Sequence, residues 1–191
     1  MIEDFVRFGS AEYVALLGLL LGSRGADFLS TWVATPHLVL EGNPLARKLG
    51  WKWGTLINLA VCLVFAAWPL SALVIATTSA LVAARNFQAA WLMRTLGEEQ
   101  YREWYVQHLR NTPLPLYLFC LLGQTLLVTA VGAALMLVAM TSLESAHAAK
   151  TTLFADGQLV PFAVGLGIVA YAVAVVFYTS LALWRIRRSG G

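Results

Sequence analysis

Residues 53–93 read WGTLINLAVCLVFAAWPLSALVIATTSALVAARNFQAAWLM, an apolar stretch that contains one charged residue, Arg85. As a single helix it would reach about 60 Å, roughly twice the ~30 Å hydrocarbon core of a bilayer. Trp68-Pro69 lies near its middle, and proline breaks a helix there because it lacks a backbone donor. The stretch therefore predicts two membrane-crossing helices, about 53–68 and 70–93, joined by a very tight turn.

The composition of the whole chain agrees with a membrane setting. Its 191 residues are 59% hydrophobic and 12% charged, with a mean hydropathy of +0.72, whereas soluble domains carry about 25% charged residues. The net charge of +3 comes from basic residues between the apolar runs. These residues form no continuous basic face, so no binding of nucleic acid is predicted. We expect an all-α integral membrane protein, a helix bundle forming one domain over residues 1–191 and surrounded by membrane lipids.

Three further apolar runs are long enough to cross a bilayer. They cover about 13–35, 116–140 and 159–184. The N-terminus is acidic rather than basic, and no small-residue cleavage site follows the first run, so we expect this run to remain as a span. Together with the two helices around Pro69, the runs predict five transmembrane helices.

The distribution of Lys and Arg predicts the orientation of these spans. With five spans, the connectors 36–52 and 94–115 share one side with the C-terminus. That side holds nine basic residues: Arg47, Lys48, Lys52, Arg94, Arg102, Arg110, Arg185, Arg187 and Arg188. The opposite side holds only Arg7 and Lys150. Because short loops rich in Lys and Arg stay cytoplasmic, we expect the N-terminus outside and the C-terminus inside, in a bacterial inner membrane.

The connector between the third and fourth spans has a helical pattern of its own. Aromatic residues recur at helical spacing within 96–110, with charged residues among them. Gly97 suits the end of the preceding span, and Glu98 and Glu99 suit the start of a new helix. The pattern predicts either a short amphipathic helix on the cytoplasmic membrane surface or an ordinary helix in a solvated loop.

Charged residues inside the spans indicate the candidate site. A charge at the centre of a transmembrane helix costs at least about 2.5 kcal/mol on insertion scales, so each requires a partner or a purpose. Asp27 in the first span and Arg85 in the third lie at similar depth, and we expect them to pair across the bundle. Arg24, one turn from Asp27, is the competing partner. Polar residues at comparable depth complete this predicted buried cluster: Thr31, Asn58, Asn86 and Gln124.

Two roles for the predicted cluster remain open. As a structural feature, it is a buried ion pair that fixes the helix register, with the amides forming interhelical hydrogen bonds. As a functional site, it binds an anionic headgroup or a small anion, or relays a proton. Two arginines against one carboxylate favour an anion over a cation.

A second set of polar residues is predicted at the cytoplasmic mouth of the bundle, namely His37, Glu41, Asn43 and His108. His37 and Glu41 have the i, i+4 spacing of two metal ligands on one helix face. A turn signal follows them at once, so we favour histidines at the membrane interface without a metal. The spans contain no histidine or lysine and no nucleophile–base arrangement, so no cofactor and no catalytic residues are predicted.

The motif Asp27-x-x-Ser30-Thr31, followed by Glu41-Gly42-Asn43-Pro44, resembles an uncharacterised prokaryotic integral-membrane family. That family carries Asp-x-x-Ser/Thr-Thr in its first helix and Glu-x-Asn-Pro in the loop after it. The resemblance covers roughly residues 20–90 and implies a small helical bundle with a site at Asp27 and Glu41. The lysine that the family leads us to expect in the second span is absent, and Asn58 is the polar residue found there.

These patterns predict a membrane protein without catalytic activity, either a subunit or accessory of a membrane complex or a protein that handles lipids or anions. One alternative is a small transporter or proton relay, which requires water access to Asp27 and Arg85. Another is a membrane-embedded enzyme that modifies lipid. The enzyme would require His37, Glu41 and His108 to converge at the mouth of the bundle.

Overall fold

The structure, a computed structural model, describes residues 5–40, 44–148 and 159–188. Within these ranges the chain is all-α, as predicted, and contains no strand. The helices are α1 (Ala11–Ala34), α2 (Pro44–Phe65), α3 (Pro69–Leu96), α4 (Glu98–Asn111), α5 (Leu114–Ala148) and α6 (Leu159–Arg188). Most bounds lie within a few residues of the expected spans. The second span differs, because α2 begins well before residue 53 and ends three residues before residue 68.

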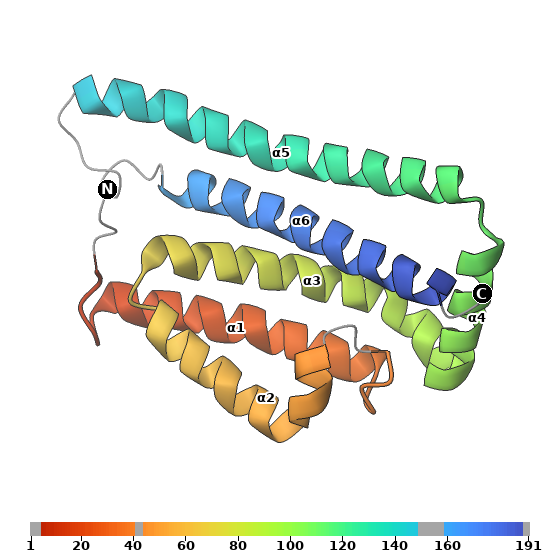
Figure 1. The fold of residues 1–191 in the computed structure, drawn as a ribbon. Coiled ribbons are helices and arrows are strands. Elements are labelled where there is room, and N and C mark those ends of the chain that lie inside the picture. Colours follow the sequence, from red (N-terminus) through yellow and green to blue (C-terminus); the bar gives the residue numbers. More distant parts are fainter. Residues whose placement is uncertain (1–4, 41–43, 149–158, 189–191) are drawn as a thin grey trace.

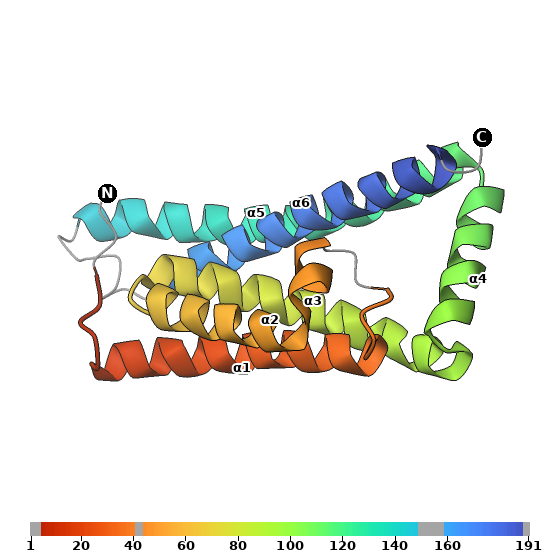
Figure 2. The same ribbon diagram turned by 60° about the horizontal axis from the view of Figure 1, so that its bottom comes forward.

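The helices form one layered bundle in which α3 is central (Figure 1). It packs against α1 on one side and against α6 on another, while α5 lies along α6 and α2 along α1. Helices α1, α3 and α6 run in the same direction, and α2 and α5 run in the opposite direction. Helix α4 crosses one end of the bundle and joins α3 to α5 (Figure 2).

Small residues bring the long helices close together. The face of α3 toward α1 buries Ala72, Ala76, Ser79, Ala83 and Ala90, which are spaced three, four or seven residues apart along one side of the helix. On the α6 side, a Cβ atom added to Gly167 would lie 2.8 Å from Cβ of Thr77. Between α5 and α6, a Cβ atom on Gly132 would lie 2.7 Å from the carbonyl oxygen of Gly165. These contacts require glycine, because any side chain would overlap the neighbouring helix.

The predicted helix breaks lie where the sequence places them. Pro69 is the first residue of α3, and residues 66–68 form the tight turn after α2. Gly97 has φ of 81°, a conformation that favours glycine, and separates α3 from α4. A break that the sequence did not predict lies at Gly50, whose φ of 63° divides α2 into a short first piece and a longer second piece.

Among the described residues, four helices are long and apolar enough to cross a membrane: α1, α3, residues 114–140 of α5, and α6. The chain is therefore a multi-pass membrane protein. Helix α2 is not among the four, although the sequence predicted a span there. Its piece after Gly50, residues 51–65, measures only about 22 Å at 1.5 Å per residue, less than the ~30 Å of a bilayer core.

Although its apolar piece is short, α2 runs back alongside α1 in the opposite direction. The Phe28 and Trp51 rings meet near the end of α1 at 5.9 Å, and the Tyr13 hydroxyl, near its start, donates to the carbonyl of Leu63 at 2.9 Å. The N–H of Val6 donates to the carbonyl of Ala67 at 3.0 Å. The segment before α1 and the α2–α3 turn thus lie at the same end of the bundle.

Candidate functional site

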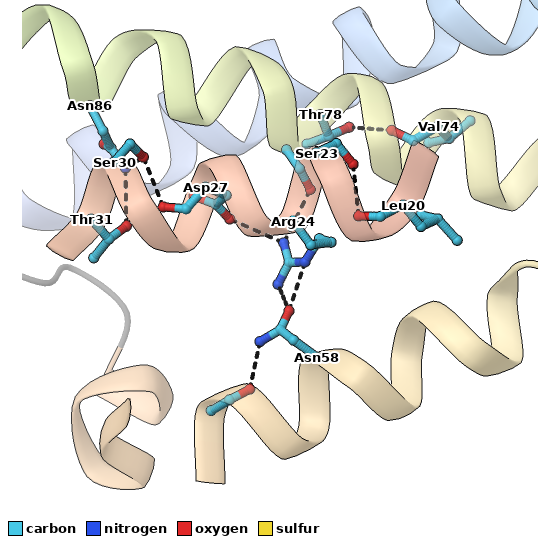
Figure 3. A network of polar contacts seen from close by, with 12 residues as sticks. Leu20, Ser23, Arg24, Asp27, Ser30, Thr31, Asn58, Val74, Thr78 and Asn86 are labelled. Atoms are coloured by element: carbon cyan, nitrogen blue, oxygen red, sulfur yellow. Dashed lines mark hydrogen bonds and ion pairs between the residues drawn. The ribbon is translucent and has the colours of Figure 1, made fainter. Parts of the chain in front are cut away.

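Arg24 connects three helices through its guanidinium group (Figure 3). From α1, its Nε donates to Oδ1 of Asn58 on α2 at 2.7 Å, and Nη2 donates to the same oxygen. Nη1 donates to Oδ2 of Asp27 and to Oγ of Ser79 on α3, each at 3.2 Å. The amide nitrogen of Asn58 donates to the carbonyl of Gly54 at 2.8 Å, which orients its oxygen toward Arg24. All three guanidinium nitrogens therefore have protein acceptors.

The network continues along α1 toward its C-terminal end. Ser30 is fully buried, and its hydroxyl donates to the backbone carbonyl of Asp27 at 2.8 Å. The amide of Asn86 on α3 donates to Oγ of Ser30 at 3.3 Å and to Oγ1 of Thr31 at 3.2 Å. The structure thus brings together five of the residues assigned to the predicted cluster: Arg24, Asp27, Thr31, Asn58 and Asn86. Because these groups bond to one another, the geometry favours a role in fixing helix register.

The expected pair of Asp27 and Arg85 is not formed. Among the described residues, Asp27 makes its ion pair with Arg24, at 3.2 Å. Between the levels of Ser79 and Asn86, the α3 residue that faces α1 is Ala83. Arg85 lies about 200° around the helix from Ala83, at 100° per residue, and its side chain is exposed. Matching the two residues by depth was insufficient, because depth does not fix the face of a helix.

Gln124 also lies apart from the network. It is exposed on α5, and within the described residues α5 packs along α6 and not along α1. Its place in the predicted cluster is therefore wrong. The depth of Gln124 in the membrane can be counted along the chain, whereas the order of the helices across the bundle cannot.

Sequence reasoning missed an acidic contact at the end of the bundle. Glu98, the first residue of α4, accepts hydrogen bonds from Oγ1 of Thr35 at 2.6 Å and from the N–H groups of His37 at 3.0 Å and Val39 at 3.2 Å. Burial alone would raise the pKa of Glu98, but these hydrogen bonds outweigh it and hold the pKa below its usual value. No local pattern could reveal contacts between residues that lie 59 to 63 positions apart in the chain.

The residues of the predicted mouth do not form one site. His37 lies in a turn rather than on a helix, so the i, i+4 argument for His37 and Glu41 does not hold. Glu41 and Asn43 lie outside the described residues. The His108 ring packs on the Trp104 ring at 4.4 Å, near the far end of α4. In the ranges that the structure covers, no three His, Cys, Asp or Glu side chains are grouped to bind a metal.

A shallow, open depression of about 630 Å³ lies beside Glu98. It is lined by the connector after α1 and by the α3–α4 junction, including His37, Arg94 and Gln100. Arg94 also lies 5.8 Å from the ring of Trp32 on α1. The depression is thus bounded by segments that Glu98 and Arg94 hold together.

The geometry defines a class of protein, a multi-pass helical bundle whose first three helices share a polar network. Comparison with known proteins finds no matching family model, no matching curated protein and no matching solved structure. The resemblance to a prokaryotic membrane family therefore remains a prediction.

Replacing Arg24 with Gln should lower the stability of the protein in detergent by roughly 3–5 kcal/mol, because Asp27 loses its guanidinium partner in a largely buried position. The double variant Arg24→Gln/Asp27→Asn should recover much of this loss. Arg102→Gln, an exposed site on α4, is the control and should unfold near the wild-type temperature. Thermal unfolding of the purified variants measures all three. Strictly additive losses in the double variant would contradict the coupling.

Replacing Glu98 with Gln should destabilise the protein at neutral pH by about 1–3 kcal/mol, because three hydrogen bonds lose a charged acceptor. Since the folded-state pKa is lowered, this stabilisation is complete above the unfolded value of about 4.3. It is lost as the pH falls through the folded-state pKa. The difference between wild type and Glu98→Gln in thermal unfolding should therefore shrink in acid. Glu99→Gln, the neighbouring exposed carboxylate, is the control. Equal effects of the two substitutions at neutral pH would refute a specific role for Glu98.

Proposed function

We propose that this protein is a five-pass protein of a bacterial inner membrane that handles an anionic lipid or a small anion at its cytoplasmic side. It has no catalytic activity of its own in this proposal, and it acts alone or as an accessory subunit of a membrane complex. The observation that carries the proposal is the exposed Arg85 side chain within the apolar helix α3.

The two intramembrane arginines differ in what surrounds them. Arg24 is surrounded by acceptors from three helices, whereas Arg85 forms no ion pair with any residue that the structure describes. A cation exposed along an apolar helix requires a counter-charge or a path to water. An anion drawn from the membrane or from the cytoplasm would supply the counter-charge, which supports a role in handling anions.

The proposed topology is supported by which segments meet at each end of the bundle. Thr35 at the end of α1 bonds to Glu98 at the start of α4, and Arg187 near the end of α6 donates to the carbonyl of Thr112 at 3.1 Å. These segments carry most of the basic residues. The positive-inside rule then supports a cytoplasmic C-terminus, with α2 as a shortened fifth pass.

The alternatives receive less support from the geometry. A proton relay through Asp27 and Arg85 would require a proton to pass between the two side chains. Arg85, however, does not lie on the face of α3 that packs against α1. A lipid-modifying site at the mouth would require His37 and His108 to converge. The backbone of His37 bonds to Glu98, and His108 lies ten residues further along α4, about 15 Å away.

The proposed kinship with the prokaryotic membrane family rests on the motif in α1. Asp27, Ser30 and Thr31 are all used in contacts of the polar network. If the kinship holds, the motif serves that network, and its acidic member is the partner of Arg24.

Cysteine labelling tests the proposed topology. In a background that lacks Cys62 and Cys120, a cysteine at Lys48 should react only from the cytoplasmic side and a cysteine at Lys150 only from the outside. The physical reason is that five passes put these connectors on opposite sides of the membrane. Labelling of both positions from the same side would show that α2 does not cross.

Lipid analysis tests the proposed function. Protein purified in a gentle detergent should retain anionic lipid at a share above that of the membrane from which it was extracted, because Arg85 needs a counter-charge. Mass spectrometry of the co-purified lipids and proteins measures this share. A retained lipid mixture identical to that of the bulk membrane would refute the handling of anionic lipid.

A further inference from the structure

The connector after α1, residues 35–40, surrounds the carboxylate of Glu98 with three donors. The hydroxyl of Thr35 donates to Oε2 at 2.6 Å. The N–H group of His37 donates to Oε1 at 3.0 Å, and that of Val39 donates to Oε2 at 3.2 Å. Thr35 is only 4% exposed, so a hydroxyl group left there without an acceptor would be costly. Both carboxylate oxygens are bound, and the connector therefore has the donor set of a carboxylate-binding site.

The same connector is braced by hydrogen bonds other than those to the carboxylate. The N–H group of Leu38 donates to the carbonyl of Thr35 at 3.0 Å. The N–H group of Leu40 donates to the hydroxyl oxygen of Thr35 at 3.2 Å, which also orients the hydroxyl proton away from Leu40. The indole N–H of Trp51 on α2 donates to the carbonyl of Pro36 at 3.0 Å. The connector is thus held from within and from α2, so its shape does not depend on the carboxylate that it binds.

Leu38 lies between the two backbone donors and has a φ of 58°. This left-handed conformation is uncommon for a residue that carries a side chain, and it occurs in the backbone concavities that bind anions. The N–H groups on either side of Leu38 serve the carboxylate, whereas its own N–H group serves Thr35. A strained residue persists only where its surroundings hold it, and the braces of the connector do so. The binding site is therefore preformed.

The open depression of about 630 Å³ gives access to this site, because Glu98, His37 and Val39 are among the residues that line it. Figure 2 shows the segment after α1 beside the α3–α4 junction, at the end of the bundle. Charged and amide side chains also line the depression, namely Arg94, Glu99 and Gln100. Such groups keep their water when they are not paired. The depression therefore suits a small water-soluble ion.

We propose that residues 35–39 form a carboxylate receptor, that Glu98 is its internal ligand, and that a small organic carboxylate from water occupies the receptor when the Glu98 side chain is absent or displaced. The receptor recognises the negative charge and both oxygens, because its three donors converge on them. Glu98 begins α4, so the internal ligand ties the end of α1 to α4, whereas an external carboxylate would separate them. This site does not include Arg85, and the inference is independent of the function proposed above.

The first test is chemical rescue of Glu98→Ala by acetate, which has the size of the fragment that this substitution removes. Thermal unfolding of the full-length protein in a neutral detergent measures the binding. Acetate at about ten times its dissociation constant should raise the unfolding temperature of Glu98→Ala by roughly 3–6 °C. Wild type and Glu98→Gln should not gain, because a side chain already fills the receptor. Glu99→Ala, at the neighbouring exposed carboxylate, should not gain either.

Acetamide and sodium chloride separate a specific site from a general effect. Acetamide has the shape of acetate without its charge, and sodium chloride matches its ionic strength, so both should leave Glu98→Ala unchanged. Adding Thr35→Val removes the hydroxyl donor and should abolish most of the gain from acetate. An equal rise with sodium chloride, or no rise with acetate at any concentration, would refute the receptor.

Amide hydrogen exchange, resolved residue by residue, tests whether the receptor is preformed. In Glu98→Ala without acetate, the N–H groups of His37 and Val39 should exchange roughly tenfold faster or more, as expected for the loss of a charged acceptor. Those of Leu38 and Leu40 should keep their wild-type protection, because their acceptors belong to Thr35. Glu98→Gln, which keeps the side-chain volume, gives the same comparison if Glu98→Ala does not fold. Loss of protection at all four N–H groups together would show that Glu98 shapes the connector, and the proposal would be wrong.

Discussion

The guanidinium group of Arg24 is the constraint on which the first half of the bundle depends. Inside a membrane, water cannot satisfy its donors, so protein acceptors must surround it. Those acceptors come from α1, α2 and α3. Each helix is therefore held at the rotation and height that present its acceptor, and a shift of any one would leave a charged donor without a partner.

This constraint matters most for α2. Its apolar piece is shorter than a bilayer core, and many of its large side chains, such as Trp53 and Leu56, are exposed. Apolar packing gives little preference for one position within lipid, because lipid tails are as apolar as the side chains. The bonds from Arg24 to Asn58 and from Tyr13 to the carbonyl of Leu63 are directional. They define where α2 lies along α1, which packing alone would leave loosely defined.

The second half of the bundle is organised by close backbone contact. Gly132 and Gly165 let α5 and α6 touch, and Gly167 lets α6 touch α3. At the α4 end this close packing stops. Glu98 fixes the start of α4 to the connector after α1, while Arg187 ties the end of α6 to the carbonyl of Thr112. With both ends of α4 attached, this helix crosses the end of the bundle between α3 and α5.

The sequence by itself determined the membrane class, the all-α fold, the breaks at Pro69 and Gly97 and the helix expected within residues 96–110, which the structure places at Glu98–Asn111. These features depend on local hydropathy and on backbone preferences that neighbouring residues set. It also determined that Arg24 and Asp27 need partners, because the cost of a buried charge does not depend on the fold. Only the tertiary structure decided which residues these partners are. Asp27 pairs with Arg24 rather than Arg85, Gln124 lies on a helix apart from the network, and Glu98 holds a distant loop. The physical reason is that depth can be counted along a helix, whereas the face a residue presents depends on the rotation of each helix and on which helices are neighbours. Both are set by contacts between residues far apart in the chain.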